Sequence, residues 1–206
     1  MDEHVLTATR LSLHAVAEQL LAGPQHRAKG TIRLRVTPGG FGQVAGEWRV
    51  EGDRLVGPGV RVPLTGTIAD VSTAAGLEAG APTIYSDHAD LADDAPLAVD
   101  AAAAAELAEW FARGEAGLRA FAPEAEPVLW PEHFDLGIAV DEVNYGISPG
   151  DDGHPAPYAY VGPWTQREGP FWNAAFGSLR PAVELPDTEA VAAYFGAGRA
   201  AAATDA

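Results

Sequence analysis

The chain is expected to have an α+β fold, in which a mainly antiparallel sheet packs against a long central helix and further helices lie near the N- and C-termini. Two blocks of segments with strand periodicity flank one long segment with helical periodicity. Strands and helices do not alternate regularly, as they would in parallel units, so antiparallel pairing is favoured. The length of 206 residues suits one domain. We expect a single domain over residues 1–199 and a frayed tail over residues 200–206.

The first block reads as a helix followed by short antiparallel strands. Apolar side chains at helical spacing predict the helix, and Gly23-Pro24 is expected to end it. Gly52-Asp53 predicts a hairpin turn, because glycine readily takes a positive φ. The glycine-rich run that follows Thr37 is expected to form a turn. The expected elements are a helix over 7–21, strands over 31–36, 47–51, 54–56 and 60–62, and a short helix over 67–77.

A solvated acidic loop over residues 81–95, which includes His88, is expected between the two blocks. The helix after it has the clearest pattern in the chain, with Asp100 placed to cap its N-terminus. Gly114 and Gly117 interrupt its apolar stripe and predict close approach to a sheet, since each otherwise costs roughly 1 kcal/mol relative to alanine. The expected elements are a helix over 100–121, strands between 123 and 185, and a last helix over 187–198.

Composition excludes several classes of function. The chain has no cysteine, so disulfides, thiolate chemistry and iron–sulfur clusters are ruled out. A net charge of −16 makes nucleic acid and anionic membrane surfaces poor partners. The sequence contains no run of about 20 apolar residues and no apolar N-terminal leader. We therefore expect a cytoplasmic protein with no membrane or nucleic-acid partner, whose oligomeric state the sequence leaves open.

The segment from residue 129 to 164 is the best candidate for a functional site. Read as a strand, residues 133–140 separate by parity into two faces. One face is apolar, whereas the other carries His133 and Asp135 beside small residues. A purely structural strand has little need of a His-x-Asp pair in that setting, so the second face is expected to be functional.

A hairpin with Asp141-Glu142 at its tip gives a self-consistent register for this segment. The apolar residues then pair with one another, and Gly137 pairs with Gly146 on the opposite face. The result is a recess with a small-residue floor and a polar rim, and Tyr158 and Tyr160 follow on the next strand. The candidate ligand-binding residues are His133, Asp135, Asn144, Ser148, Tyr158 and Tyr160.

Other interpretations of the same residues remain open. A metal site would use His133, Asp135 and His154, a set that suits Fe(II), with Mn or Zn as alternatives. This set is similar to the His-x-Asp…His motif of cupin-type oxygenases, but the second histidine follows Asp135 much more closely than in that family. Hydrolysis through Ser148, His133 and Asp135 would require an awkward geometry, because strand neighbours two residues apart point side by side. General acid/base work by His133 beside Asp135 is a further interpretation. In the structural alternative, His133 and Asp135 hydrogen-bond each other and the loop at residues 151–152, and they only fix the fold.

Several motifs spread over most of the chain resemble those of a family of uncharacterised proteins common in actinobacteria. They are LRVTPGGFG (34–42), APLAVD (95–100), LWPEHFDL (129–136), NYGISPGD (144–151) and PYAYVGPW (157–164). The resemblance implies a bacterial source and a cytoplasmic location, and it implies no activity. The sequence therefore predicts binding of a small polar or aromatic molecule in the 129–164 recess. The alternatives are a metal-dependent enzyme and a structural or interaction protein without a pocket.

Overall fold

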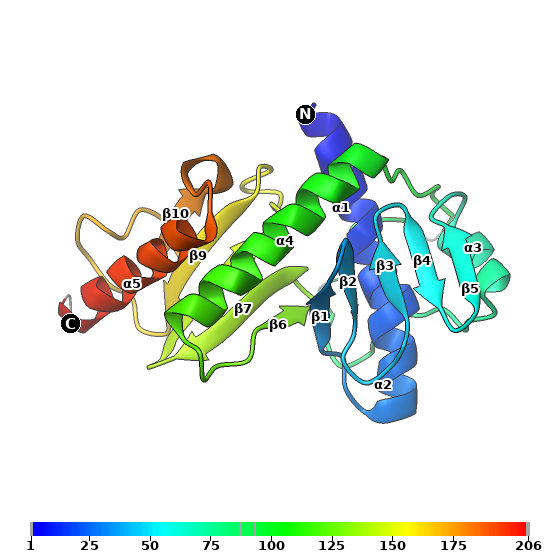
Figure 1. Cartoon of the computed structure of the whole chain (residues 1–206), viewed down its shortest axis with the longest axis horizontal. Coiled ribbons are helices and arrows are strands. Elements are labelled where there is room, and N and C mark those ends of the chain that lie inside the picture. Colours follow the sequence, from blue (N-terminus) through cyan, green and yellow to red (C-terminus); the bar gives the residue numbers. More distant parts are fainter. Residues whose placement is uncertain (1, 87, 93, 205–206) are drawn as a thin grey trace. The chain divides into compact units, whose positions relative to one another are not determined.

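The computed structural model describes residues 2–86, 88–92 and 94–204, so Asp87 and Asp93 of the expected acidic loop lie outside the described residues. The chain divides into two compact units. Unit 1 comprises Met1–Glu109 and Leu129–Phe134, and unit 2 comprises Trp110–Val128 and Asp135–Ala206. Both units combine helices with antiparallel strands, which confirms the α+β class (Figure 1). The expectation of a single domain stays a prediction.

Unit 1 begins with a long helical stretch that continues past Pro24. It consists of α1 (Glu3–Val16), the π-helical turn η1 (Ala17–Ala22) and α2 (Gly23–Lys29). Pro24 has no N–H, so it cannot donate to the carbonyl of Gln19, five residues earlier, as a π-helical turn would require. That carbonyl accepts a hydrogen bond from Gly80 N at 3.0 Å. A distant segment thus supplies the donor that proline cannot, and the helix does not end at Gly23-Pro24 as the sequence predicts. It ends at Gly30, which has a φ of 74°.

The strands of unit 1 form an antiparallel sheet in the order β6-β1-β2-β3-β4-β5. Gly52 has a φ of 56°, and Glu51 pairs with Arg54, so the expected hairpin is confirmed. Strand β2 was not expected, because its glycines read as a turn. A Cβ on Gly40 would lie 2.3 Å from Val50 O, so the backbones approach too closely for any side chain. The strands are β1 (Leu34–Thr37), β2 (Gly40–Gln43), β3 (Arg49–Glu51), β4 (Arg54–Gly57), β5 (Val60–Pro63) and β6 (Val128–Trp130).

Helix α3 (Ile68–Ala75) follows the sheet of unit 1, and residues 76–100 follow the helix. Thr67 and Asp70 form a capping box at the start of α3, and Gly76 ends it with a φ of 68°. The described part of residues 76–100, which we call the strap, has no regular secondary structure. Irregular segments of this length are uncommon in compact units and are often functional.

Helix α4 (Ala101–Phe121) starts in unit 1 and continues into unit 2. The Asp100 carboxylate accepts hydrogen bonds from the N–H groups of Ala102 and Ala103 at 3.0 and 2.9 Å. The expected N-cap is therefore confirmed.

The sheet of unit 2 has the strand order β10-β9-β8-β7 and is antiparallel throughout. Its first hairpin has the register predicted from the sequence, with Gly137 opposite Gly146. Both tip residues, Asp141 and Glu142, have positive φ values of 53° and 61°, as a two-residue turn of this twist requires. The strands are β7 (Asp135–Val140), β8 (Val143–Ser148), β9 (Tyr158–Pro163) and β10 (Ser178–Pro181).

Helices α4 and α5 (Thr188–Thr204) cover one face of this sheet. A Cβ on Gly114 would lie 2.4 Å from Ile147 of β8, so the predicted close approach of helix to sheet is confirmed. Gly117 lies equally close to Val191 of helix α5 and not to a strand, so the prediction of approach to the sheet is wrong at this position. Helix α5 continues to Thr204, so residues 200–204 are helical where the sequence predicts a frayed tail. The run of alanines there explains the extension, because alanine has the highest helix propensity.

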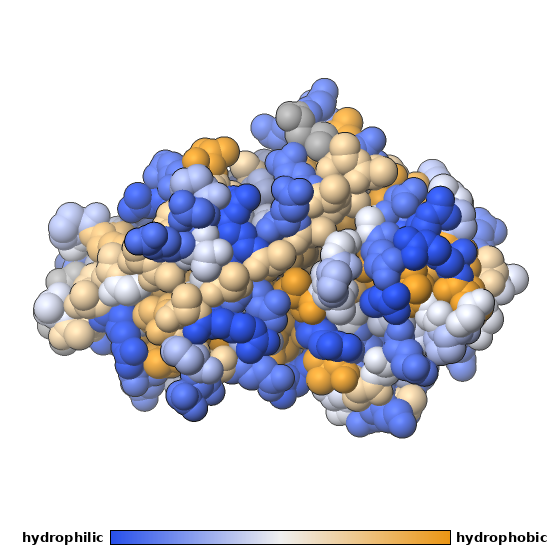
Figure 2. Space-filling model, in the orientation of Figure 1, coloured by the Kyte–Doolittle hydropathy of each residue, from blue (hydrophilic) through white to orange (hydrophobic). Residues whose placement is uncertain are grey.

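Figure 2 shows hydrophilic residues over much of the drawn face, together with a band of apolar residues and several smaller apolar patches. Within the described residues, no helix combines the length and the apolar character that a membrane span needs.

Candidate functional site

Five of the six predicted ligand-binding residues share one face of the unit 2 sheet. The register places Gly146 opposite both Gly137 and Tyr160, and it places Ser148 opposite Tyr158. By strand alternation, Asp135 and Asn144 lie on this same face. It is the face opposite the one that α4 and α5 cover, and we call it the outer face.

The floor of the predicted recess is covered by a side chain of the protein itself. A Cβ on Gly146 would lie 2.5 Å from both Cζ and the hydroxyl oxygen of Tyr160. A Cβ on Gly137 would lie 3.1 Å from the same hydroxyl. The two glycines therefore make room for the Tyr160 phenol, and a molecule on this face would meet the tyrosine and not the backbone.

Two tyrosine–aspartate pairs lie on the outer face. The Tyr160 hydroxyl donates to Asp135 Oδ2, and the Tyr158 hydroxyl donates to Asp151 Oδ2. Burial, together with the negative charge of Asp135, raises the pKa of Tyr160 well above its usual value. Burial and the hydrogen bond to Asp151 raise the pKa of Tyr158 in the same direction. Both phenols are therefore neutral at pH 7, and each donates a hydrogen bond to an aspartate side chain.

Asp151 is held by more than one donor. Its Oδ1 accepts from the N–H groups of Gly153 and His154, each at 2.7 Å. Burial acts to raise the pKa of Asp151, but the hydrogen bonds from Tyr158 and from these N–H groups outweigh it and lower the pKa. The carboxylate therefore stays ionised at neutral pH and keeps the loop after β8 folded.

Three aromatic rings gather around these pairs. The ring centroids of Tyr158, Tyr160 and Phe176 lie 6.4 to 6.5 Å from one another. Phe176 is 43% exposed, so the group reaches solvent. Trp164, which is 65% exposed, donates from Nε1 to Asn144 Oδ1 at 3.1 Å. The outer face thus presents aromatic surface beside the carboxyl groups of Asp135 and Asp151.

The two histidines of the expected metal set lie in loops. His133 is exposed, in a turn of unit 1 before β7, because the positive φ of Phe134 (51°) interrupts the alternation that the sequence predicts. His154 is exposed in unit 2, with its ring 5.6 Å from that of Tyr158. Among residues 2–86, 88–92 and 94–204, no group of three or more histidine or acidic side chains is arranged to hold a metal ion. The metal alternative stays a prediction.

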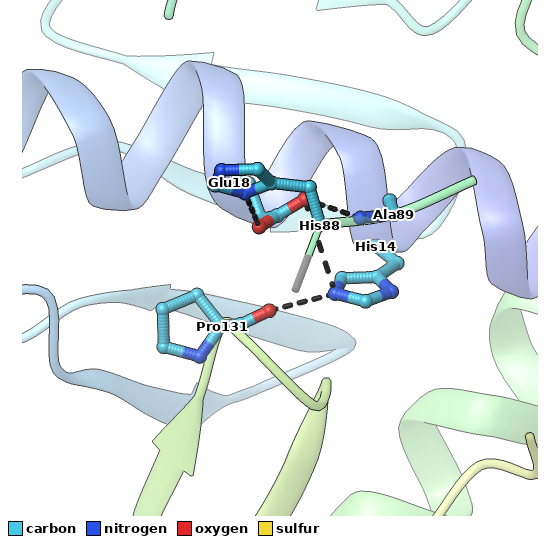
Figure 3. A network of polar contacts seen from close by, with 5 residues as sticks. All are labelled: His14, Glu18, His88, Ala89 and Pro131. Atoms are coloured by element: carbon cyan, nitrogen blue, oxygen red, sulfur yellow. Dashed lines mark hydrogen bonds and ion pairs between the residues drawn. The ribbon is translucent and has the colours of Figure 1, made fainter. Parts of the chain in front are cut away.

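A second polar centre lies in unit 1, around the buried carboxylate of Glu18 (Figure 3). Glu18 lies on η1 and is 1% exposed. Its Oε1 lies 2.8 Å from His88 Nδ1, and its Oε2 accepts from Ala89 N at 2.8 Å. A carboxylate only accepts hydrogen bonds, so this contact requires a proton on His88 Nδ1 when Glu18 is charged.

His14 on α1 borders the same centre. Its Nε2 lies 2.7 Å from the carbonyl oxygen of Pro131 and 4.0 Å from Glu18 Oε2, and its ring stacks on Phe134. Burial lowers the pKa of His14, although the charge of Glu18 opposes that shift. His14 is therefore neutral at pH 7, and it donates its Nε2 proton to Pro131.

The Glu18 centre is one of several places where hydrogen bonds join the strap to the N-terminal helical stretch. Ser12 Oγ accepts from Ala98 N at 2.9 Å. Arg27 donates to the carbonyl oxygens of Glu78 and Gly80. The strap therefore runs along the helix in the opposite direction, with Glu18 and His88 near its middle.

Sequence reasoning missed Glu18 and assigned His88 to a solvated loop. That assignment is wrong in one respect, because His88 Nδ1 contacts the buried Glu18 carboxylate. One signal was present, because Glu18 interrupts the apolar stripe that includes Val16 and Leu20. An acidic residue in such a stripe must find a partner when it is buried. The partner lies 70 residues away, and no local pattern predicts it.

The fold and these two centres define an α+β protein of two units, with an acidic aromatic face in one and a buried carboxylate–imidazole centre in the other. Comparisons with protein-family models, with curated proteins and with solved structures find no match.

Proposed function

We propose that unit 2 binds a small aromatic molecule on its outer face, and that a ligand with a cationic amine is preferred to one with a carboxylate. The site comprises Asp135, Tyr158, Tyr160 and Phe176. His133 lies in unit 1 and forms no part of this proposed face. The observation that carries the proposal is the convergence of two tyrosine–aspartate pairs on one partly exposed aromatic group.

The preference for a cation follows from the charges around the tyrosines. The charged groups that act on the Tyr158 hydroxyl are both carboxylates, Asp151 and Asp135. A carboxylate oxygen has a second lone pair that accepts a further donor, and aromatic faces attract organic cations. A flat ring would stack on the exposed side of Phe176, and an attached amine would reach a carboxylate.

Titration with tryptamine and with indole-3-acetate tests this proposal, since the two molecules share a ring and differ in charge. We expect tryptamine to bind about tenfold more tightly, a difference of roughly 1.4 kcal/mol. NMR chemical-shift changes at the amides of β7 and β9 would report both the affinity and the location. Equal affinity for the two molecules would contradict the preference, and the absence of any shift with either would contradict the site.

Asp135→Asn and Glu189→Gln form a matched pair of variants. Each removes one negative charge, but Glu189 lies on α5, which covers the opposite face. We expect only Asp135→Asn to weaken tryptamine binding. A loss of thermal stability in Asp135→Asn with unchanged affinity would assign the Tyr160–Asp135 pair to the fold alone.

A further inference from the structure

We propose that Glu18 and His88 form a second site, in unit 1, where His88 acts as a general base toward a neutral or cationic substrate and Glu18 is its positioning residue. This site is independent of the ligand-binding face of unit 2. The geometry points to it through a buried carboxylate, an exposed imidazole and an unusual helical turn.

The hydrogen bonds fix the orientation of the imidazole. Glu18 is itself held, because its Oε2 accepts from Ala89 N at 2.8 Å while its Oε1 lies 2.8 Å from His88 Nδ1. A proton on Nδ1 leaves Nε2, on the far side of the ring from the carboxylate, with a lone pair that can accept a proton. A carboxylate that orients a histidine in this way is a recurring arrangement in general-base catalysis.

The burial of the two side chains differs, as this role requires. The Glu18 side chain is 2% exposed, whereas the His88 side chain is 39% exposed. Here the carboxylate is shielded from water, which strengthens its hold on the imidazole, and the imidazole remains accessible to a substrate.

The local backbone also sets this centre apart. Glu18 lies on the π-helical turn η1, and turns of this kind occur frequently at functional sites. His88 lies on the strap, an irregular segment of the length that often carries function. Helix and strap are joined beside this point by the hydrogen bond from Gly80 N to Gln19 O.

The charges around the site select the substrate. The Tyr85 ring lies 5.0 Å from the His88 ring, and the charges that act on the Tyr85 hydroxyl are those of Glu18 and Glu132. His14, the other imidazole at this centre, is neutral at pH 7. An anionic substrate at the Tyr85 side of the His88 ring would meet repulsion from two carboxylates, whereas the positive charge of Arg10 acts on His14 on the other side of Glu18. At His88 a neutral or cationic molecule is therefore favoured.

The chemical step needs only water as a second reactant. His88 Nε2 accepts a proton from a water molecule while the water oxygen bonds to the acyl carbon of an ester. The bond between the acyl carbon and the leaving oxygen then breaks, and the proton passes from Nε2 to the leaving group or to solvent. The imidazole returns to its starting state, and the products are an acid and an alcohol.

Hydrolysis of p-nitrophenyl acetate, a small neutral ester, tests the general-base role. We expect the wild-type protein to exceed the His88→Gln variant by about tenfold, below the 10²–10⁴-fold typical of an evolved general base because this ester is only a probe. His4→Gln is the matched control, since His4 is exposed on α1, away from Glu18 along the helix. Equal rates for wild type and His88→Gln would overturn the proposal.

A spectroscopic measurement tests the positioning role of Glu18 separately. In long-range ¹H–¹⁵N spectra at pH 8, we expect His88 to carry its proton on Nδ1 in the wild type. Glu18→Gln, which keeps the shape but removes the charge, should lower both the Nδ1-protonated population and the ester hydrolysis rate. A His88 ring protonated on Nε2 in the wild type would contradict the assignment. If Glu18→Gln does not fold, the His88→Gln rate decides.

Discussion

Gly146 and Gly162 both lie on the outer face of unit 2, but they differ in how much space a side chain would have. At Gly146, a Cβ would lie 2.5 Å from the Tyr160 ring and 2.7 Å from Leu136 O. At Gly162, a Cβ would meet its nearest neighbours at 3.5 and 3.9 Å, which is ordinary contact. Glycine is therefore required at the first position and merely tolerated at the second.

This difference predicts opposite outcomes for two alanine substitutions. Gly146→Ala should destabilise unit 2 by roughly 1–3 kcal/mol, because Tyr160 must move off its place and the Leu136 carbonyl cannot. Gly162→Ala should leave stability unchanged or raise it by up to about 1 kcal/mol, through a lower entropy of the unfolded chain. Thermal melts of both variants measure the effect. Equal melting temperatures would show that Tyr160 does not rest on Gly146.

At the scale of elements, the contact between α4 and the unit 2 sheet depends on a helical glycine. Gly114 brings the helix so close to β8 that a Cβ would lie 2.4 Å from Ile147 Cγ1. Gly196, in the middle of α5, has no heavy atom within 4 Å of the position its Cβ would take. Both glycines carry the same helix-propensity cost, so their substitution separates packing from propensity.

We expect Gly114→Ala to destabilise the protein by about 1–3 kcal/mol, because the added methyl group forces Ile147 or the helix to shift. Gly196→Ala should stabilise it by roughly 0.5–1 kcal/mol, the ordinary gain of alanine in a helix. Urea titrations followed by circular dichroism provide both values. A stabilising Gly114→Ala would mean that α4 and β8 do not approach as closely as the geometry requires.

The elements that the sequence predicts well are those whose cause is local. The apolar stripe and the Asp100 cap predict α4. The apolar pairs between β7 and β8 predict the register of this hairpin, because a slip of one residue would turn the apolar side chains to the opposite face. The elements that it misses depend on distant partners. The glycines of β2 read as a turn, and only their close contact with Val50 on the neighbouring strand explains them. The helix continues past Pro24 because Gly80 N donates a hydrogen bond to Gln19 O.

The candidate sites follow the same division. Strand parity brought Asp135, Asn144 and Tyr160 to one face, because alternation is a local property. It did not predict that Tyr160 covers the glycine floor, since that depends on the rotamer of one side chain. The positive φ of Phe134 broke the alternation at His133, and a left-handed phenylalanine has no sequence signal.

At the scale of the whole molecule, all five tyrosines are held in environments that oppose ionisation. Burial is the largest cause in every case, and it raises the pKa of Tyr85, Tyr145, Tyr158, Tyr160 and Tyr194, the last to about 12. In the unfolded chain each phenol ionises near pH 10. Folding therefore favours the protonated form of every tyrosine in the protein.

This asymmetry predicts how stability depends on pH on the alkaline side. Below pH 10 the tyrosines are protonated in both the folded and the unfolded protein, so their contribution to the free energy of unfolding is fully present. Above pH 10 the unfolded chain loses its phenol protons first. Stability therefore falls as the pH rises toward the folded pKa values. We expect the melting temperature to drop between pH 10 and pH 12, and absorbance at 295 nm to rise with unfolding and not before it. Phenolate absorbance with a midpoint near pH 10 in a protein that keeps its far-ultraviolet circular dichroism would contradict the burial of these hydroxyls. Tyr158→Phe should lessen the drop, because it removes one of the groups that ionise on unfolding.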